Sequence, residues 1–227
     1  MADDLGPDIA EVIEELGSTF TIVRTGLTEK VLSNLRELAR DPAFQERHFD
    51  AVLSYNTAIN SGDIIQSGGE NFIVMDKSTD DFEDSVVKCN AVLYKCNLPS
   101  TTKILIPTET TNETTFAVTV SWSIRLGTVY GLLFPGARGA VLNQENITGK
   151  ELTYKLMCFV PDFYGVERYD RFYLSASEFY RVEDIEKHQY AGIHVLSLVE
   201  DERAVYASNS PSSSPSTSPS SSPSVSP

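Results

Sequence analysis

Short apolar stretches of strand length, separated by polar turns, fill the chain from about residue 49 to residue 198. The clearest one runs from Phe116 to Leu126, where every second residue is apolar and the residues between are small or polar. A period of two is typical of a strand with one buried and one solvated face. Further strands are expected at 49–55, 71–75, 85–94, 103–107, 152–160, 171–174, 179–185 and 193–198. This succession predicts a mainly β (α+β) fold with two small β-barrel or β-sandwich lobes.

The first 48 residues follow a different pattern. Apolar residues at positions 9, 12, 13 and 16 share one helix face, and Gly17 is a suitable end for that helix. Residues 19–23 alternate as a short strand does. A second helix is expected from Thr28 to about Asp41, with apolar residues at 31, 35, 38 and 39 on one face. The first helix is also acidic, which fits either a solvated face or a docking helix for a basic partner.

These patterns divide the chain into an N-terminal helical and strand segment (1–48), a first β lobe (49–107), a Thr-rich linker (108–115), a second β lobe (116–207) and a tail (208–227). In the tail, proline recurs at every fourth position among serines, so little there can bury apolar surface. We expect this Ser/Pro tail to be disordered. It is either a spacer or an inert repeat expansion at a tolerant terminus.

Two segments far apart in the sequence resemble each other. In each, an aspartate opens an apolar strand, a polar turn follows, and a second strand returns with an aromatic residue, a valine and an aspartate. The first runs from Asp63 to Val74, and the second from Asp170 to Val182. An internal repeat and a chance similarity between two ordinary hairpins both account for this pattern.

The charge balance narrows the range of functions. Thirty-two acidic and 18 basic residues give a net charge of −14 at pH 7, the opposite of what binding to nucleic-acid phosphates requires. No apolar run approaches the roughly 20 residues of a membrane helix, and the first residues lack the features of a secretory signal. Three cysteines are too few for a disulfide scaffold, and we expect core or half-buried thiols at Cys89, Cys96 and Cys158.

The sequence lacks the usual patterns of catalytic and metal-binding residues. It contains no nucleophile elbow, phosphate-binding loop or dinucleotide fingerprint. Its three histidines and its cysteines do not have the spacing of a metal site. The acidic run 76–84 resembles a calcium loop at first, but Asp81 stands where glycine is needed and Val87 where the last glutamate belongs, so we expect a solvated acidic loop there. The sequence therefore predicts a protein that is not an enzyme and has no cofactor or metal.

Several short motifs stand out between residues 59 and 97. A Gly-Asp turn leads into a strand, an aromatic-x-Val strand follows, and a later strand ends in a Lys-Cys-Asn tripeptide. The residues concerned are Gly62, Asp63, Phe72, Val74, Lys95, Cys96 and Asn97, and a later segment adds Asp170, Tyr180 and Val182. These motifs resemble neck proteins of tailed bacteriophages, in the head-closure (stopper) or head–tail connector family. The resemblance covers roughly residues 50–100 and 165–205.

The resemblance implies a structural virion protein of the phage neck, made in the host cytoplasm. It implies a homo-oligomeric ring, usually a hexamer, that lies beneath the portal protein, seals packaged DNA and docks the tail proteins. DNA would pass or be blocked without sequence-specific binding, no membrane is involved, and an acidic bore would repel phosphates. The candidate bore-facing elements are Asp80, Asp81, Glu83 and Asp84, and the glycine-rich loop at Gly136 and Gly139.

Two other classes of function stay open. A tail-completion, tail-terminator or baseplate component would share small β lobes and ring assembly. A β-rich module that binds a carbohydrate or a host surface could stack its ligand on Trp122. That residue lies on the apolar face of its predicted strand, which favours a place in the core.

Overall fold

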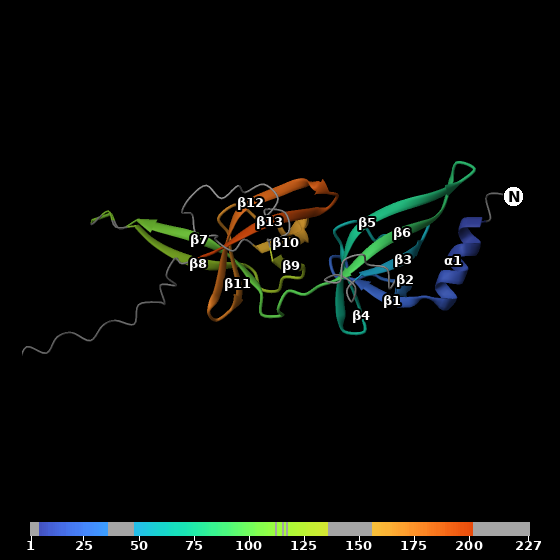
Figure 1. The fold of residues 1–227 in the computed structure, drawn as a ribbon, viewed down its shortest axis with the longest axis horizontal. Helices are drawn as coiled ribbons and strands as arrows, with labels where there is room; N and C mark the ends of the chain where they lie inside the picture. The colour runs from blue at the N-terminus through green and yellow to red at the C-terminus, as the bar shows by residue number, and fades with distance from the viewer. Residues whose placement is uncertain are drawn as a thin grey trace, which may run out of the picture.

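The computed structural model describes residues 5–35, 48–111, 113, 114, 116, 118–135 and 156–201. An N-terminal helix precedes a series of antiparallel strands, so the mainly β fold is confirmed. The strands form two sheets, one in each of two lobes that lie side by side along the longest axis of the molecule (Figure 1).

The first lobe is a closed antiparallel barrel with the strand order β1-β2-β3-β6-β5-β4. Its strands are β1 (Ser18–Ile22), β2 (Thr28–Leu35), β3 (His48–Ser54), β4 (Ile64–Ser67), β5 (Glu70–Phe82) and β6 (Ser85–Lys95). Because β1 pairs with both β2 and β4, the described sheet closes and has no edge strand. The barrel core is apolar and includes Phe20, Val31, Leu53, Ile65, Val74 and Leu93.

The predicted first helix is confirmed as α1 (Leu5–Leu16). Asp8 in its first turn interacts favourably with the positive end of the helix dipole. The helix ends at Gly17, whose amide donates a hydrogen bond to the carbonyl of Ile13 at 2.8 Å. Ile13 is buried against the barrel, whereas Val12 and Leu16 of the predicted apolar face remain exposed. The helix packs on β2, β3 and β6.

The predicted second helix is wrong over its described part, because Thr28–Leu35 is the strand β2. Its apolar residues at 31 and 35 are four apart, a spacing that places them on one face of a helix and also on one side of a strand. The partners decide between the two, since β2 pairs with β1 on one side and with β3 on the other. The remainder of that predicted helix lies outside the described residues.

The second lobe contains an antiparallel sheet with the described strand order β8-β7-β11-β12-β13-β10-β9. Its strands are β7 (Lys103–Thr111), β8 (Val118–Leu126), β9 (Leu132–Pro135), β10 (Leu156–Pro161), β11 (Arg171–Ser175), β12 (Glu178–Tyr190) and β13 (Ile193–Glu200). A short 3-10 helix, η2 (Asp162–Tyr164), follows β10. The core of this lobe includes Ile104, Val160, Phe172, Val182, Leu196 and Leu198.

Several boundaries differ from the sequence expectation. The barrel already begins at Ser18, so the strands before residue 49 belong to it. Residues 108–111 were expected to start a linker but lie in β7, paired with β8, and the chain instead leaves β6 for β7 between Lys95 and Lys103. The acidic run 76–84 was expected to be a loop, yet β5 continues to Phe82. In the last two cases, pairing with a neighbouring strand extends the element beyond what local polarity indicates.

The two segments that resemble each other in sequence adopt the same local structure. Strands β4 and β5 form a hairpin, as do β11 and β12. Each second strand then continues into a long hairpin, β5–β6 and β12–β13. The register of β5 against β6 shifts immediately after Val74, and the register of β12 against β13 shifts immediately after Val182. A bulge at the same position of both copies favours an internal repeat over chance similarity.

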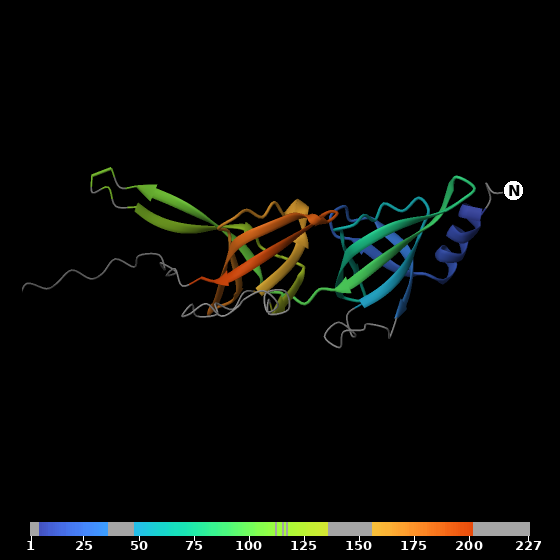
Figure 2. The ribbon, with the colours of Figure 1, turned by 45° about the horizontal axis from the view of Figure 1, so that its top comes forward.

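The opposite ends of the molecule carry different elements. Helix α1 lies at the far end of the first lobe, and the β7–β8 hairpin projects from the second lobe in the other direction (Figure 2). The described part of the chain is therefore elongated and has two distinct ends.

Candidate functional site at the lobe junction

The Gly-Asp turn of the first lobe is held by backbone and side-chain hydrogen bonds. The Gly62 amide donates to the Val74 carbonyl at 2.7 Å, and the Val74 amide donates to the Asp63 carbonyl at 3.0 Å. The buried Asp63 carboxylate accepts from the Asn60 amide at 2.9 Å and from Arg24 through Nε at 2.8 Å and Nη2 at 3.1 Å. This paired hydrogen bonding of a guanidinium and a carboxylate fixes the turn against the end of β1.

The second lobe repeats this turn at Asp170. The Tyr169 amide donates to the Val182 carbonyl at 2.9 Å, and the Val182 amide donates to the Asp170 carbonyl at 2.9 Å. The Asp170 carboxylate accepts from the Glu167 amide at 2.8 Å and lies 3.3 Å from Arg125 Nη1. Burial raises the pKa of Asp170, while the Glu167 amide and the Arg125 charge act to lower it. The aspartates thus hold the turns together, and the motif residues perform the same structural task in both lobes.

The two lobes touch backbone to backbone at Gly62 and Gly192. Both residues have positive φ, +85° and +70°. A Cβ on Gly62 would lie 2.0 Å from the Gly192 carbonyl oxygen, and a Cβ on Gly192 would lie 2.2 Å from the Ser61 carbonyl oxygen. Only glycine therefore permits this approach. The Gly192 carbonyl also accepts a hydrogen bond from the Asp162 amide at 2.9 Å, which ties the contact to η2.

The Lys-Cys-Asn tripeptide forms the passage from the first lobe to the second. Lys95 forms an ion pair with Glu70, the first residue of β5. The Asn97 side chain donates to the Leu133 carbonyl at 2.8 Å and accepts from the Leu133 amide at 2.6 Å, as a neighbouring strand would. The Asn97 amide donates to the Gly131 carbonyl at 3.1 Å. The tripeptide therefore attaches the end of β6 to β9.

An apolar cluster fills the junction between these contacts. It combines side chains of the first lobe with side chains of the second. Its buried members are Ile64, Ile73, Leu132 and Ile193, with Met75, Tyr94, Cys96, Tyr130, Phe134, Phe159 and Tyr190 packed around them. Because Ile64 faces this cluster and Ile65 faces the barrel core, β4 is buried on both sides. An apolar contact of this kind joins the lobes into one body rather than leaving them on a flexible linker.

The remaining motif residues lie in the cores of their lobes. Phe72 is buried in the barrel and makes edge-to-face contacts with Phe20 and Phe49, at ring-centre distances of 6.0 and 5.3 Å. Tyr180 is half-buried and packs against the core that contains Val182. Sequence reasoning thus identified residues that shape the two turns and the junction. The structure brings Gly62, Cys96 and Asn97 together at contacts between the lobes.

The candidate bore-facing acidic residues lie away from the junction, toward the tip of the β5–β6 hairpin. Asp80, Asp81, Glu83 and Asp84 are all exposed, and Asp80 lies 3.3 Å from Lys88. Glu83 and Asp84 form the two-residue turn and both have positive φ, 48° and 64°. Such a turn usually carries Asn-Gly, so acidic residues here expose charge at the tip. The other candidates, Gly136 and Gly139, lie outside the described residues.

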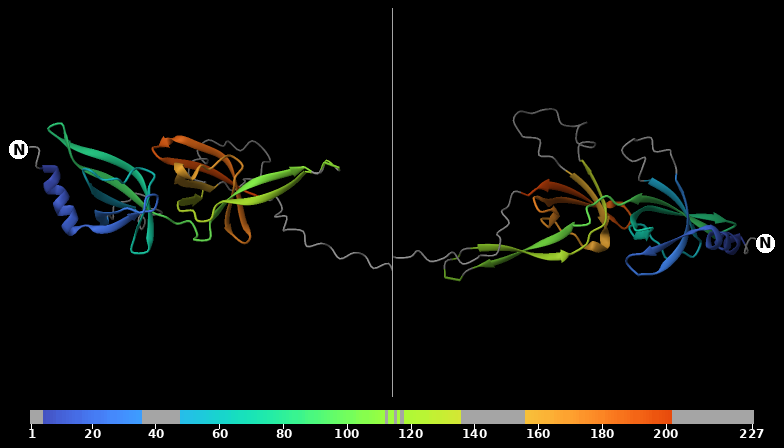
Figure 3. Two further views of the ribbon diagram at one scale, coloured as in Figure 1. Left: turned by 180° about the vertical axis from the view of Figure 1, so that it is seen from behind. Right: turned by 90° about the horizontal axis from the view of Figure 1, so that it is seen from below.

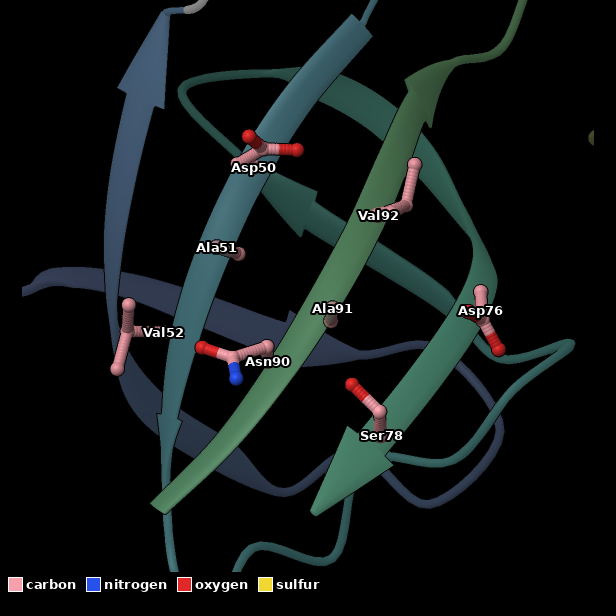
Figure 4. A pocket seen from close by; sticks show the side chains of 8 residues that line it. All are labelled: Asp50, Ala51, Val52, Asp76, Ser78, Asn90, Ala91 and Val92. Carbon is pink, nitrogen blue, oxygen red and sulfur yellow. The ribbon is translucent and has the colours of Figure 1, made fainter. Parts of the chain in front are cut away.

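A shallow depression of about 340 Å³ lies on the outer face of the barrel, over β3, β5 and β6 (Figure 4). Its lining includes the carboxylates of Asp50 and Asp76 together with the side chains of Ser78 and Asn90. Within the described part of the chain, no group of three or more His, Cys, Asp or Glu side chains is arranged to hold a metal ion. The depression thus offers polar groups on an open sheet face, without a paired nucleophile and base among its lining residues.

Sequence reasoning missed a buried ion pair in the second lobe. Arg171 is fully buried, and its Nε donates to the Asp201 carboxylate at 2.7 Å. The guanidinium carbon lies 4.1 Å from the centre of the Trp122 ring and 5.1 Å from that of Phe179. The sequence favoured a core position for Trp122, but the residue is half-buried and lies over this charge. Ile124, on the same predicted face, is 59 % exposed. No local pattern marks an arginine that becomes buried only when three strands meet.

The expectation of core or half-buried thiols is confirmed. Cys89 and Cys158 are buried and Cys96 is half-buried at the junction. Burial raises the pKa of Cys96 to about 12 and raises that of Cys158 further above its ordinary value.

We expect these thiols to resist alkylation in the folded protein. A rise in thiol pKa from 9 to about 12 lowers the thiolate fraction near neutral pH about a thousandfold. Labelling with iodoacetamide at pH 8, followed by peptide mass spectrometry, should modify Cys96 and Cys158 only after denaturation. The denatured chain is the matched control, and equal labelling rates in the two states would contradict the buried junction.

Comparison of the chain with protein-family models, with curated proteins and with solved structures finds no match. Among the described residues, no helix has the length and apolar character needed to cross a membrane.

Proposed function

We propose that this protein is a structural component of the neck of a tailed bacteriophage. In this role, copies of the chain form a head-closure or head–tail connector ring, which lies beneath the portal and docks the tail. The observation that carries the proposal is the lobe junction. The residues that resemble the neck family form equivalent turns in two lobes. The Gly62–Gly192 contact, the Lys-Cys-Asn tripeptide and the apolar cluster join these lobes into one elongated subunit.

An elongated subunit with two distinct ends suits a ring that must join two different partners. A rigid junction keeps the distance between the two partner surfaces constant, because neither lobe turns without disrupting the apolar cluster. This function requires the protein to hold its partners in place and requires no catalysed reaction. The residues singled out by the motifs do this kind of work, since they pair strands and close turns.

The charge of the chain suits contact with DNA that must not adhere. Each copy carries a net charge of −14, and a ring multiplies this charge around one axis. Such a field repels phosphates, so DNA can be held back by protruding elements and still slide past during ejection. We place the acidic tip of the β5–β6 hairpin at the bore, where Asp81 and its neighbours would face the DNA.

The proposal is tested by measuring the mass of the full-length protein, alone and mixed with a portal complex, by light scattering behind size exclusion. We expect the protein to add to the portal as a discrete ring. A protein that ignores the portal but joins tail proteins would indicate a tail-completion, tail-terminator or baseplate component. A monomer that joins neither would contradict a place in the neck or the tail.

A further inference from the structure

The β7–β8 hairpin leaves the second lobe as a two-stranded ribbon. Strand β7 pairs with β11 only through Lys103–Leu105, whereas it pairs with β8 as far as Thr111. In both views of Figure 3 the ribbon extends away from the rest of the sheet. A two-stranded ribbon is marginally stable in water by itself. Its outer part therefore gains stability if further surface covers it.

The two long edges of this ribbon differ in their protection against pairing. Pro107 interrupts the outer edge of β7, as proline commonly does on exposed edges. Strand β8 has neither proline nor a charged residue between Val118 and Ile124. Its one charge, Arg125, is engaged by the carbonyl of Gly165 and by Asp170. Within the described residues, β8 is the last strand at its end of the sheet.

The register shows which amides of β8 point away from β7. Pro107 lies opposite Trp122 and has no amide to donate, so this must be a pair that exchanges no hydrogen bonds. The pairs Glu109–Val120 and Leu105–Ile124 each lie two residues along the ladder from it, so they also exchange no hydrogen bonds. The amides of Val120 and Ile124 therefore point to the outer edge of β8, and the amide of Glu109 points to the outer edge of β7.

The charge distribution indicates what can approach this edge. Residues 103–126 contain two basic residues, Lys103 and Arg125, and two acidic residues, Glu109 and Glu113, so their net charge is zero. The whole net charge of −14 therefore lies outside the ribbon. Two copies of this chain repel each other over most of their surfaces, and the ribbon is a surface through which they can meet without that repulsion.

We propose that the outer edge of β8 is an intersubunit contact, at which a strand from a second copy of this chain extends the sheet. Backbone hydrogen bonds through amides such as those of Val120 and Ile124 would provide the pairing, and the exposed Ile124 side chain would be covered. The inference extends the proposed function, because it names the surface that joins copies in the ring. Its test needs the protein alone.

Sedimentation velocity over a concentration series tests this contact with the full-length protein. We expect wild-type protein to self-associate and Val120→Pro to shift the association midpoint at least tenfold, because proline removes an outward amide without removing a bond to β7. Glu109→Pro is the matched control. Glu109 lies directly opposite Val120, and its amide also points away from the partner strand, but on the β7 edge. The Glu109→Pro protein should therefore associate as the wild type does.

Hydrogen exchange provides a readout that needs no variant. The amides of Val120 and Ile124 should exchange more slowly as the wild-type protein associates. Association of Val120→Pro at wild-type concentrations, or unchanged exchange of β8 in the oligomer, would overturn the contact while leaving a neck function possible. A wild-type protein that is monomeric up to its solubility limit would also overturn it. Failure to bind portal or tail proteins would instead count against the proposed function.

Discussion

Replacing Gly62 with alanine is expected to lower the free energy of unfolding by about 2–5 kcal/mol. Two costs add at this position. A left-handed backbone disfavours any residue with a Cβ by about 1–2 kcal/mol, and inserting an atom into a closed contact costs roughly 1–3 kcal/mol more. The new Cβ would lie 2.0 Å from the Gly192 carbonyl oxygen, so the lobes must move apart. Denaturant unfolding measures the total loss of unfolding free energy, and small-angle scattering detects the change in lobe spacing.

Gly69→Ala is the matched control for this prediction. Gly69 has nearly the same φ, +82° against +85°, but no atom lies within 4 Å of its added Cβ. It should show the backbone cost of about 1–2 kcal/mol alone and an unchanged scattering profile. Equal losses for the two variants would mean that the close approach of the lobes contributes nothing. Gly192→Ala acts on the same contact, so the double variant should cost less than the sum of the two.

Replacing Asp201 with asparagine is expected to cost about 3–5 kcal/mol of unfolding free energy, because it removes the negative charge that lies 2.7 Å from the fully buried Arg171. The guanidinium lies against the ring of Trp122, the one tryptophan of the chain. Tryptophan emission should therefore shift in the folded variant as well, and it reports the change at the site itself.

Asp80→Asn provides the comparison for this second prediction. It removes the carboxylate of an exposed ion pair with Lys88, and such pairs contribute about 0–1 kcal/mol. The two substitutions are chemically identical and differ in burial. If Asp201→Asn were no more destabilising than Asp80→Asn, the buried pair would not support the second lobe.

The local sequence pattern was sufficient to predict secondary structure where a segment has a clear hydrophobic period. Alternation predicted most strands, and helix-face spacing predicted α1. The aspartate-valine spacing indicated two similar hairpins, as an internal repeat or by chance. Pattern was misleading where the signal is ambiguous. The spacing of Val31 and Leu35 fits a strand as well as a helix, and the four-residue strands β4 and β9 are too short to show a period. The acidic residues after Asp76 look like a loop until β6 pairs with them.

The candidate site shows the same division. Gly62, Asp63 and Asn97 were singled out in the sequence, but their tasks became visible only in the fold. Nothing local indicates that Gly62 meets Gly192, 130 positions later in the chain, or that Asn97 binds the backbone of β9. Such contacts join residues far apart in the chain, and their energy appears only after both lobes have formed.

The sequence by itself determined the fold class, the acidic charge, the position of α1 and the residues that close the two turns, because each depends on neighbours within one hairpin or one helix. Tertiary structure alone decided that residues 28–35 form a strand, that Arg171 is buried, that β8 is the last described strand at its end of the sheet, and that the two lobes join. These features depend on which strands meet across the sheets, and closing a barrel or packing two lobes selects that arrangement from many that local preference permits.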